Sequence, residues 1–137
     1  MIIKQQIKFG STRNEIDELA QKVLAGEKTA TSSLLEYYKL GIKELSKVGD
    51  YIAVLDSSDK RIVVVQVTRI EVIKFKNITE SFAIEEGDGS LSNWTAIHHP
   101  YYSDRMSAIG KELTGDTELV CEWFQVIPLT TATTQTG

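Results

Sequence analysis

The stretch that decides the fold runs from Tyr51 to Val67 and reads YIAVLDSSDKRIVVVQV. Two runs rich in β-branched and other apolar residues, 51–55 and 62–67, are separated by polar residues that favour turns. This pattern predicts a β-hairpin. The second run begins without polar alternation, which indicates a strand covered on both faces, as in a small barrel or beneath helices. We expect the pairing to continue to Phe75.

Two helices are predicted before the hairpin, on either side of the segment 26–31. Apolar residues recur at helical spacing over 16–24, and Thr12 with a glutamate three residues later forms a capping-box pattern at the helix start. Gly26 is the expected stop of this helix. The second helix is expected over 32–40, where apolar residues again share one helical side.

After the hairpin the chain is expected to form short helices, a loop and a final strand. A helix capped by Asn77 or Thr79 is predicted to run toward Glu86, and another is predicted to start at Ser90. The apolar run 118–127, which ends before a proline, predicts a closing strand. Together these elements predict an α+β protein whose strands wrap into a small β-barrel flanked by helices.

Length and composition predict one folded domain. The chain has 137 residues, of which 42% are hydrophobic and 25% are charged, as is typical of a globular protein with one core. We expect a single domain over residues 1–128 and a flexible, threonine-rich tail over 129–137. The lone Cys121 lies in an apolar run, so we expect it in the core.

The charge pattern limits the partners. A net charge of −4 gives no general argument for binding a polyanion, so any contact with nucleic acid would have to be local. The first residues lack the pattern of a secretory signal, and no apolar run approaches the length of a membrane span. We therefore expect a cytoplasmic protein without a membrane partner.

The segment 26–33 holds several hydroxyl groups around one amine, that of Lys28. In a helical or near-helical turn Lys28 and Thr31 would lie on one side, and a threonine beside an unprotonated amine is a workable nucleophile and base. The alternative is that Lys28 is a solvated lysine at a helix end and that the hydroxyls only cap the next helix. The spacing does not fit a phosphate-binding loop, because the second glycine is absent.

A second candidate is the acidic run 85–88, at the expected junction of a helix and a loop. A carboxylate in such a place can be partly buried and act as a general acid or base. The alternative is an ordinary acidic helix end that faces solvent.

A third candidate is the aromatic group around His98 and His99. Trp94, Tyr102 and the imidazoles could stack on a base or bind a ligand, although core packing is the alternative for Trp94 and Tyr102. Adjacent histidines point in different directions, and no carboxylate stands at helical spacing from them. We therefore expect no metal and no cofactor.

These features together resemble the stand-alone bacterial ASCH-domain proteins over about residues 9–127. The resemblance is carried by Gly-x-Lys-Thr-x-Thr at 26–31, by Glu-Gly-Asp at 86–88, and by the downstream Trp94 and His98. The ASCH family is similar in fold to PUA domains, in which helices cover the openings of a small β-barrel. It is associated with RNA metabolism, so the resemblance implies a cleft for a nucleoside or RNA.

One bacterial branch of the family removes the acetyl group from cytidine acetylated on its exocyclic amine. Resemblance to this branch implies that Thr31 attacks the amide carbonyl, that Lys28 activates Thr31 or steadies the oxyanion, and that Glu86 positions Lys28 or moves a proton. Glu85 is the alternative to Glu86. The expected ligand-binding residues are Gly26, Thr29, Ser33, Trp94, His98 and Tyr102.

Ser33 stands where the family motif has an arginine, five residues after the lysine. The cation that the family motif directs toward phosphate or substrate is therefore missing at this position. The alternative function is a non-catalytic module that binds RNA or a nucleotide in the same cleft.

Overall fold

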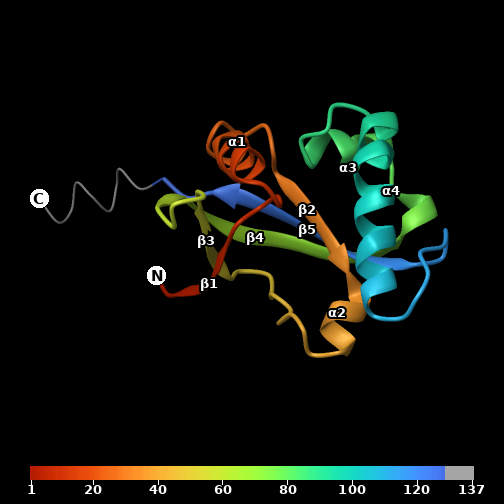
Figure 1. Ribbon diagram of the computed structural model, residues 1–137. Helices are drawn as coiled ribbons and strands as arrows, with labels where there is room; N and C mark the ends of the chain where they lie inside the picture. Colours follow the sequence, from red (N-terminus) through yellow and green to blue (C-terminus); the bar gives the residue numbers. More distant parts are fainter. Residues whose placement is uncertain (129–137) are drawn as a thin grey trace, which may run out of the picture. The chain divides into compact units, whose positions relative to one another are not determined.

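The computed structural model describes residues 1–128 and shows an α+β fold (Figure 1). Its elements are β1 (Ile3–Ile7), α1 (Arg13–Leu24), β2 (Ala30–Leu34), α2 (Leu35–Lys39), β3 (Tyr51–Leu55), β4 (Arg61–Lys74), the 3-10 helix η1 (Phe75–Asn77), α3 (Glu80–Glu85), α4 (Leu91–Ala108) and β5 (Glu118–Val126). The strands hydrogen-bond in the order β1-β3-β4-β5-β2. Because β1 is parallel to β3 and β3 is antiparallel to β4, the sheet is mixed, and the predicted α+β class is confirmed.

The hairpin forms as the sequence predicts. Strands β3 and β4 pair with Tyr51 opposite Gln66 and Val54 opposite Val63. The side chain of Asp56 accepts hydrogen bonds from two backbone N–H groups of the turn, and Asp59 adopts a positive φ of 66°. A carboxylate that bonds nearby backbone and an aspartate that tolerates this conformation are both typical of tight turns.

The helix predicted over 32–40 is wrong for its first three residues, 32–34. Residues Ala30–Leu34 form β2, and only Leu35–Lys39 are helical, as α2. Ala30 and Leu34 are buried and the three residues between them are partly exposed. Pairing with the sheet therefore overrides the weak local preference of a short run of threonine and serine.

Two further differences concern β1 and α4. Strand β1 was not predicted. In this strand Ile3, Gln5 and Ile7 are partly buried and the residues between them are exposed, which is the alternation typical of a strand. Helix α4 begins after its N-cap Ser90, as predicted, and extends to Ala108 with Pro100 inside it.

The chain divides into two compact units. The first comprises residues 1–29, 46–69 and 123–128, and the second comprises residues 30–45 and 70–122. The single domain over 1–128 stays a prediction, and the expected tail, 129–137, lies outside the described residues. No helix within residues 1–128 is both long and apolar enough to cross a membrane.

Local signals at the helix ends are confirmed in both units. In the first unit, Thr12 and Glu15 form the capping box of α1, and Gly26, with a φ of 78°, follows its end. In the second unit, Thr79 rather than Asn77 caps α3, since the Thr79 hydroxyl accepts from the N–H of Phe82. Cys121 is fully buried, as predicted.

Candidate functional site

The second unit holds a buried carboxylate, that of Glu86, which is only 4% exposed. Helix α3 packs against β2 and α4, and its buried residues Phe82 and Ala83 anchor it there. Glu86 follows Ala83 by three residues, so it lies on the same side of the helix end. Glu85 is partly exposed, and burial therefore singles out Glu86 of the two neighbouring glutamates.

Four donor groups surround the Glu86 carboxylate. The backbone N–H and the hydroxyl of Ser32 donate to it, each at 3.2 Å from Oε1, and the hydroxyl is also 3.1 Å from Oε2. The indole N–H of Trp94 donates to Oε2, and Nε2 of His98 lies 3.3 Å from Oε1. An ionised carboxylate can only accept, which suits this arrangement and offsets the loss of water on burial.

A chain of hydroxyl groups leads into the carboxylate. The Ser32 hydroxyl has one proton and donates it to Glu86, so the Tyr102 hydroxyl, 2.6 Å from Ser32 Oγ, donates to Ser32. Burial raises the pKa of Tyr102 well above its usual value, and the charge of Glu86 raises it further. Tyr102 therefore stays neutral and remains a donor.

His98 completes what we call the Glu86 cluster, which consists of Ser32, Glu86, Trp94, His98 and Tyr102. Its ring stacks on the indole of Trp94, with centroids 4.3 Å apart and planes at 15°. Burial opposes the charge of His98 and lowers its pKa, but the hydrogen bond to Glu86 and the charges of Glu86 and Asp88 outweigh it. The net effect is a raised pKa.

Glu86, Asp88 and His98 are also the residues of the second unit that could hold a metal ion, since their ligand atoms lie within 4.8 Å of one another. The carboxylates approach different nitrogens, Nε2 for Glu86 and Nδ1, at 3.6 Å, for Asp88. The two ring nitrogens point in different directions. This geometry suits an ion pair better than chelation of one ion.

The opposite face of β2 carries a separate set of contacts. Successive residues of a strand face opposite sides, so Thr31 and Ser33 lie on the side away from Ser32. The Ser33 hydroxyl lies 2.6 Å from that of Tyr38. Burial raises the pKa of Tyr38 and the charge of Glu122, itself buried, raises it further, against the Ser33 hydrogen bond.

The predicted residues Gly26, Lys28 and Thr29 lie in the first unit. Lys28 is 4% exposed and its ammonium nitrogen is 4.8 Å from the ring centroid of Phe9, a cation–π distance. The alternative of a solvated lysine at the helix end is therefore wrong. The carbonyl of Thr29 accepts from the N–H of Phe124, at 3.0 Å, which ties this segment to β5.

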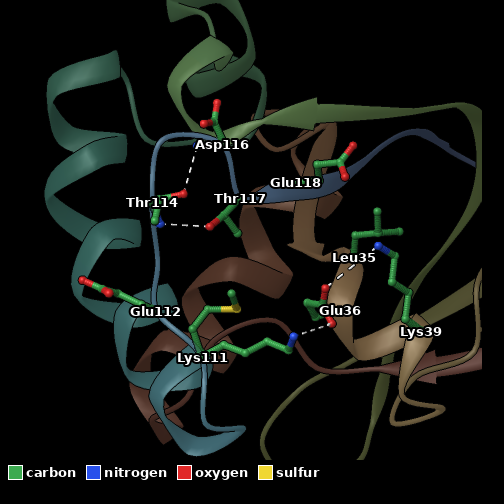
Figure 2. A pocket seen from close by; sticks show the side chains of 10 residues that line it. Leu35, Glu36, Lys39, Lys111, Glu112, Thr114, Asp116, Thr117 and Glu118 are labelled. Carbon is green, nitrogen blue, oxygen red and sulfur yellow. Dashed lines mark hydrogen bonds and ion pairs between the residues drawn. The ribbon is translucent and has the colours of Figure 1, made fainter.

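A surface pocket of about 320 Å³ lies elsewhere in the second unit, between α2 and the region from α4 to β5 (Figure 2). Its lining residues are Leu35, Glu36, Lys39, Met106, Lys111, Glu112, Thr114, Asp116, Thr117 and Glu118. Figure 2 shows Lys39 and Lys111 directed toward Glu36, with ion-pair distances of 3.9 and 3.8 Å. No predicted site residue lines this pocket.

The structure thus brings some of the predicted site residues together. Glu86, Trp94, His98 and Tyr102 meet in one cluster, and the burial of Trp94 and Tyr102 favours their packing alternative. Ser33 is bonded to Tyr38 instead. Sequence reasoning missed Ser32, and the signal that could have found it is strand alternation over 30–34, with Ala30 and Leu34 buried on its face.

The chain belongs to the ASCH family. The sequence model of the ASCH domain matches residues 5–128, which is almost the whole described chain. None of the curated proteins matches the chain.

Solved structures support this membership. A crystal structure of an ASCH domain from Lactobacillus crispatus is 28% identical, covers 89% of this chain and 78% of its own, and superposes with a TM-score of 0.85. Protein EF3133 from Enterococcus faecalis, of the DUF984 family, is 29% identical with the same TM-score and covers 98% of this chain and 83% of its own. The hypothetical protein PH0355, at 18% identity, coverage of 90% and 96%, and a TM-score of 0.56, shares the fold alone.

Proposed function

We propose that the protein hydrolyses an acyl amide on a small polar ligand, with a nucleoside acetylated on its exocyclic amine as the substrate class. The observation that carries the proposal is the buried Glu86 carboxylate, which binds the backbone N–H of Ser32, next to the proposed nucleophile Thr31. Membership of the ASCH family and the motif at 26–31 support it.

In the proposed reaction the Thr31 hydroxyl attacks the amide carbonyl carbon. The C–N bond then breaks as the leaving amine takes up the proton that the Thr31 hydroxyl gave up, and the acyl group remains as an ester on Thr31. Water hydrolyses this ester, which releases a carboxylic acid and restores the hydroxyl. On the motif alone, we assign Lys28 either to relay this proton as the unprotonated amine or to steady the oxyanion as the ammonium.

The role proposed for Glu86 is to position rather than to transfer a proton. A carboxylate that already accepts from four donors binds a further proton weakly. Its bonds to Ser32 hold β2 in place at the residue adjacent to Thr31. A small displacement of a reacting group lowers the reaction rate strongly. We therefore expect turnover to depend on the hydrogen bonds that hold β2 in place.

Two features favour a small ligand over RNA. The net charge of −4 repels a polyanion as a whole. In addition, Ser33, in place of the family arginine, is engaged with Tyr38 and brings no cation to the motif.

The test is to incubate the protein with acetylcytidine and follow cytidine release by chromatography. We expect release that falls at least about 100-fold in Thr31→Ala and in Lys28→Ala, as for loss of a group that acts directly in the chemistry. Thr31→Ser keeps a hydroxyl and is the matched control, expected to retain turnover. Full turnover in both alanine variants would contradict the proposal.

Absence of release from the unmodified protein would also contradict it for this substrate. A titration with single-stranded RNA over a salt series then distinguishes the alternative. Affinity that falls steeply with salt would indicate a binding module, because release of counterions accompanies each phosphate contact.

A further inference from the structure

The imidazole of His98 faces an acceptor on each of its ring nitrogens. Nδ1 lies 2.9 Å from the backbone oxygen of Trp94, and Nε2 lies 3.3 Å from Oε1 of Glu86. A backbone carbonyl and an ionised carboxylate can only accept, whereas a neutral imidazole carries a single N–H. Only the imidazolium form, with two N–H groups, satisfies both contacts at once.

The surroundings of the ring favour the same form. Titratable groups face it from each packed element: Glu86 at the end of α3, Asp88 in the following loop, and Tyr102 one turn further along α4. The two carboxylates are anionic partners, and Tyr102 is neutral. The indole of Trp94 presents its face to the ring, and an aromatic face attracts a cation.

The ring is also held in place from one helix. The bond from Nδ1 to the Trp94 carbonyl joins residues four apart on α4, and the stack on the Trp94 indole sets the plane of the ring. Nε2–H is thereby directed at Glu86, whose other oxygen accepts from the indole of the same Trp94.

We infer that His98 is a protonated positioning residue near neutral pH, which joins the Glu86 carboxylate to α4 and fixes its direction. The sequence suggested that His98 binds the ligand. In the role inferred here, His98 instead holds Glu86, the residue that constrains β2. The protonation state follows from the geometry of the second unit alone, whereas the consequence for turnover rests on the proposed function.

The first test measures protonation without any activity. Histidine labelled with ¹⁵N is followed by NMR in the full chain carrying His99→Gln, so that His98 is the only imidazole. We expect both ring nitrogens to be protonated at pH 7, with a pKa above the ordinary value of about 6.5. Glu86→Gln on this background should lower the pKa, and Asp88→Asn should lower it less, since its distance is longer.

A neutral His98 at pH 7, or a midpoint that Glu86→Gln leaves unchanged, would overturn the inference. Neither outcome depends on whether acetylcytidine is a substrate, because the NMR measurement reports only the protonation of His98.

The second test measures turnover. We expect His98→Gln to lower kcat about tenfold, as for loss of one hydrogen bond to a charged group, with little change in KM. It should also remove the decline of kcat at the alkaline end of the pH profile, where His98 loses its proton. His99→Gln, which changes the exposed neighbour, should do neither. Turnover that depends on Thr31 but has an unaltered pH profile in His98→Gln would refute the positioning role and leave the proposed function standing.

Discussion

The Glu86 cluster and the pocket of Figure 2 lie in the same unit, and both hold opposite charges at close range. In the cluster, Glu86 is 4% exposed and accepts from backbone, hydroxyl, indole and imidazole groups. In the pocket, Glu36 meets two lysines at distances near 4 Å, and those lysines are about half exposed.

The difference shows that a hollow does not by itself make a chemical site. Charges in water are screened, and an exposed pair contributes little to stability or to the field that a ligand meets. Charges removed from water interact strongly and must be matched by donors or acceptors. The Glu86 cluster, unlike the pocket, removes its charges from water and matches the Glu86 carboxylate with donors.

The comparison predicts its largest effect at Glu86. Glu86→Gln removes the charge but keeps the size, so His98 and the other donors lose their anion. We expect the free energy of unfolding in urea to fall by about 3 kcal/mol, the range for breaking a buried charged pair. The matched control Glu85→Gln, at a partly exposed position, should change it by less than about 0.5 kcal/mol. Equal effects of the two variants would remove the distinction between the glutamates.

A second prediction concerns pH. Because the folded pKa of His98 is raised, its contribution to stability is complete below the unfolded value of about 6.5 and is lost as pH rises through the folded value. The free energy of unfolding should therefore fall above about pH 6.5, by roughly 1.4 kcal/mol for each unit by which the pKa is raised. His98→Gln should flatten this dependence between pH 6 and pH 9, as followed by urea titration. An identical slope in the variant would show that another group is responsible.

A third, smaller effect is expected at the end of the hydroxyl chain. Tyr102→Phe removes the donor to Ser32 and should lower the free energy of unfolding by about 1 kcal/mol, the usual value of one hydrogen bond. Since the folded pKa of Tyr102 is raised, its contribution is lost as pH rises above about 10, and the variant should weaken this alkaline destabilisation. Tyr101→Phe, on the exposed neighbour, is the control.

The smallest effect is expected in the pocket. Glu36→Gln breaks long, partly exposed ion pairs with Lys39 and Lys111, so the free energy of unfolding should change by less than about 0.5 kcal/mol and cytidine release should be unaltered. A fall of more than about 2 kcal/mol in the free energy of unfolding, or a loss of cytidine release, would show that the pocket contributes to stability or to turnover.

The sequence by itself determined part of the local structure of the chain. The β-branched runs on either side of a polar turn were enough for the hairpin, and hydroxyl caps were enough for the starts of α1 and α3, because these signals act over a few residues. The resemblance to the ASCH motif likewise indicated residues 26–31 and Glu86 as candidate site residues. The alternation over 30–34 was too short to outweigh a helical reading of the same residues.

Only the tertiary structure decided which side chains meet. Ser32 and Glu86 are 54 residues apart and Ser32 and Tyr102 are 70 apart, so no spacing in the chain relates them. Their contact depends on α3 and α4 packing against β2 in the second unit, and a one-residue change of register in that strand would present Thr31 or Ser33 instead. The charge of His98 follows in the same way, because it depends on two carboxylates and a carbonyl that the folded chain alone brings to its ring.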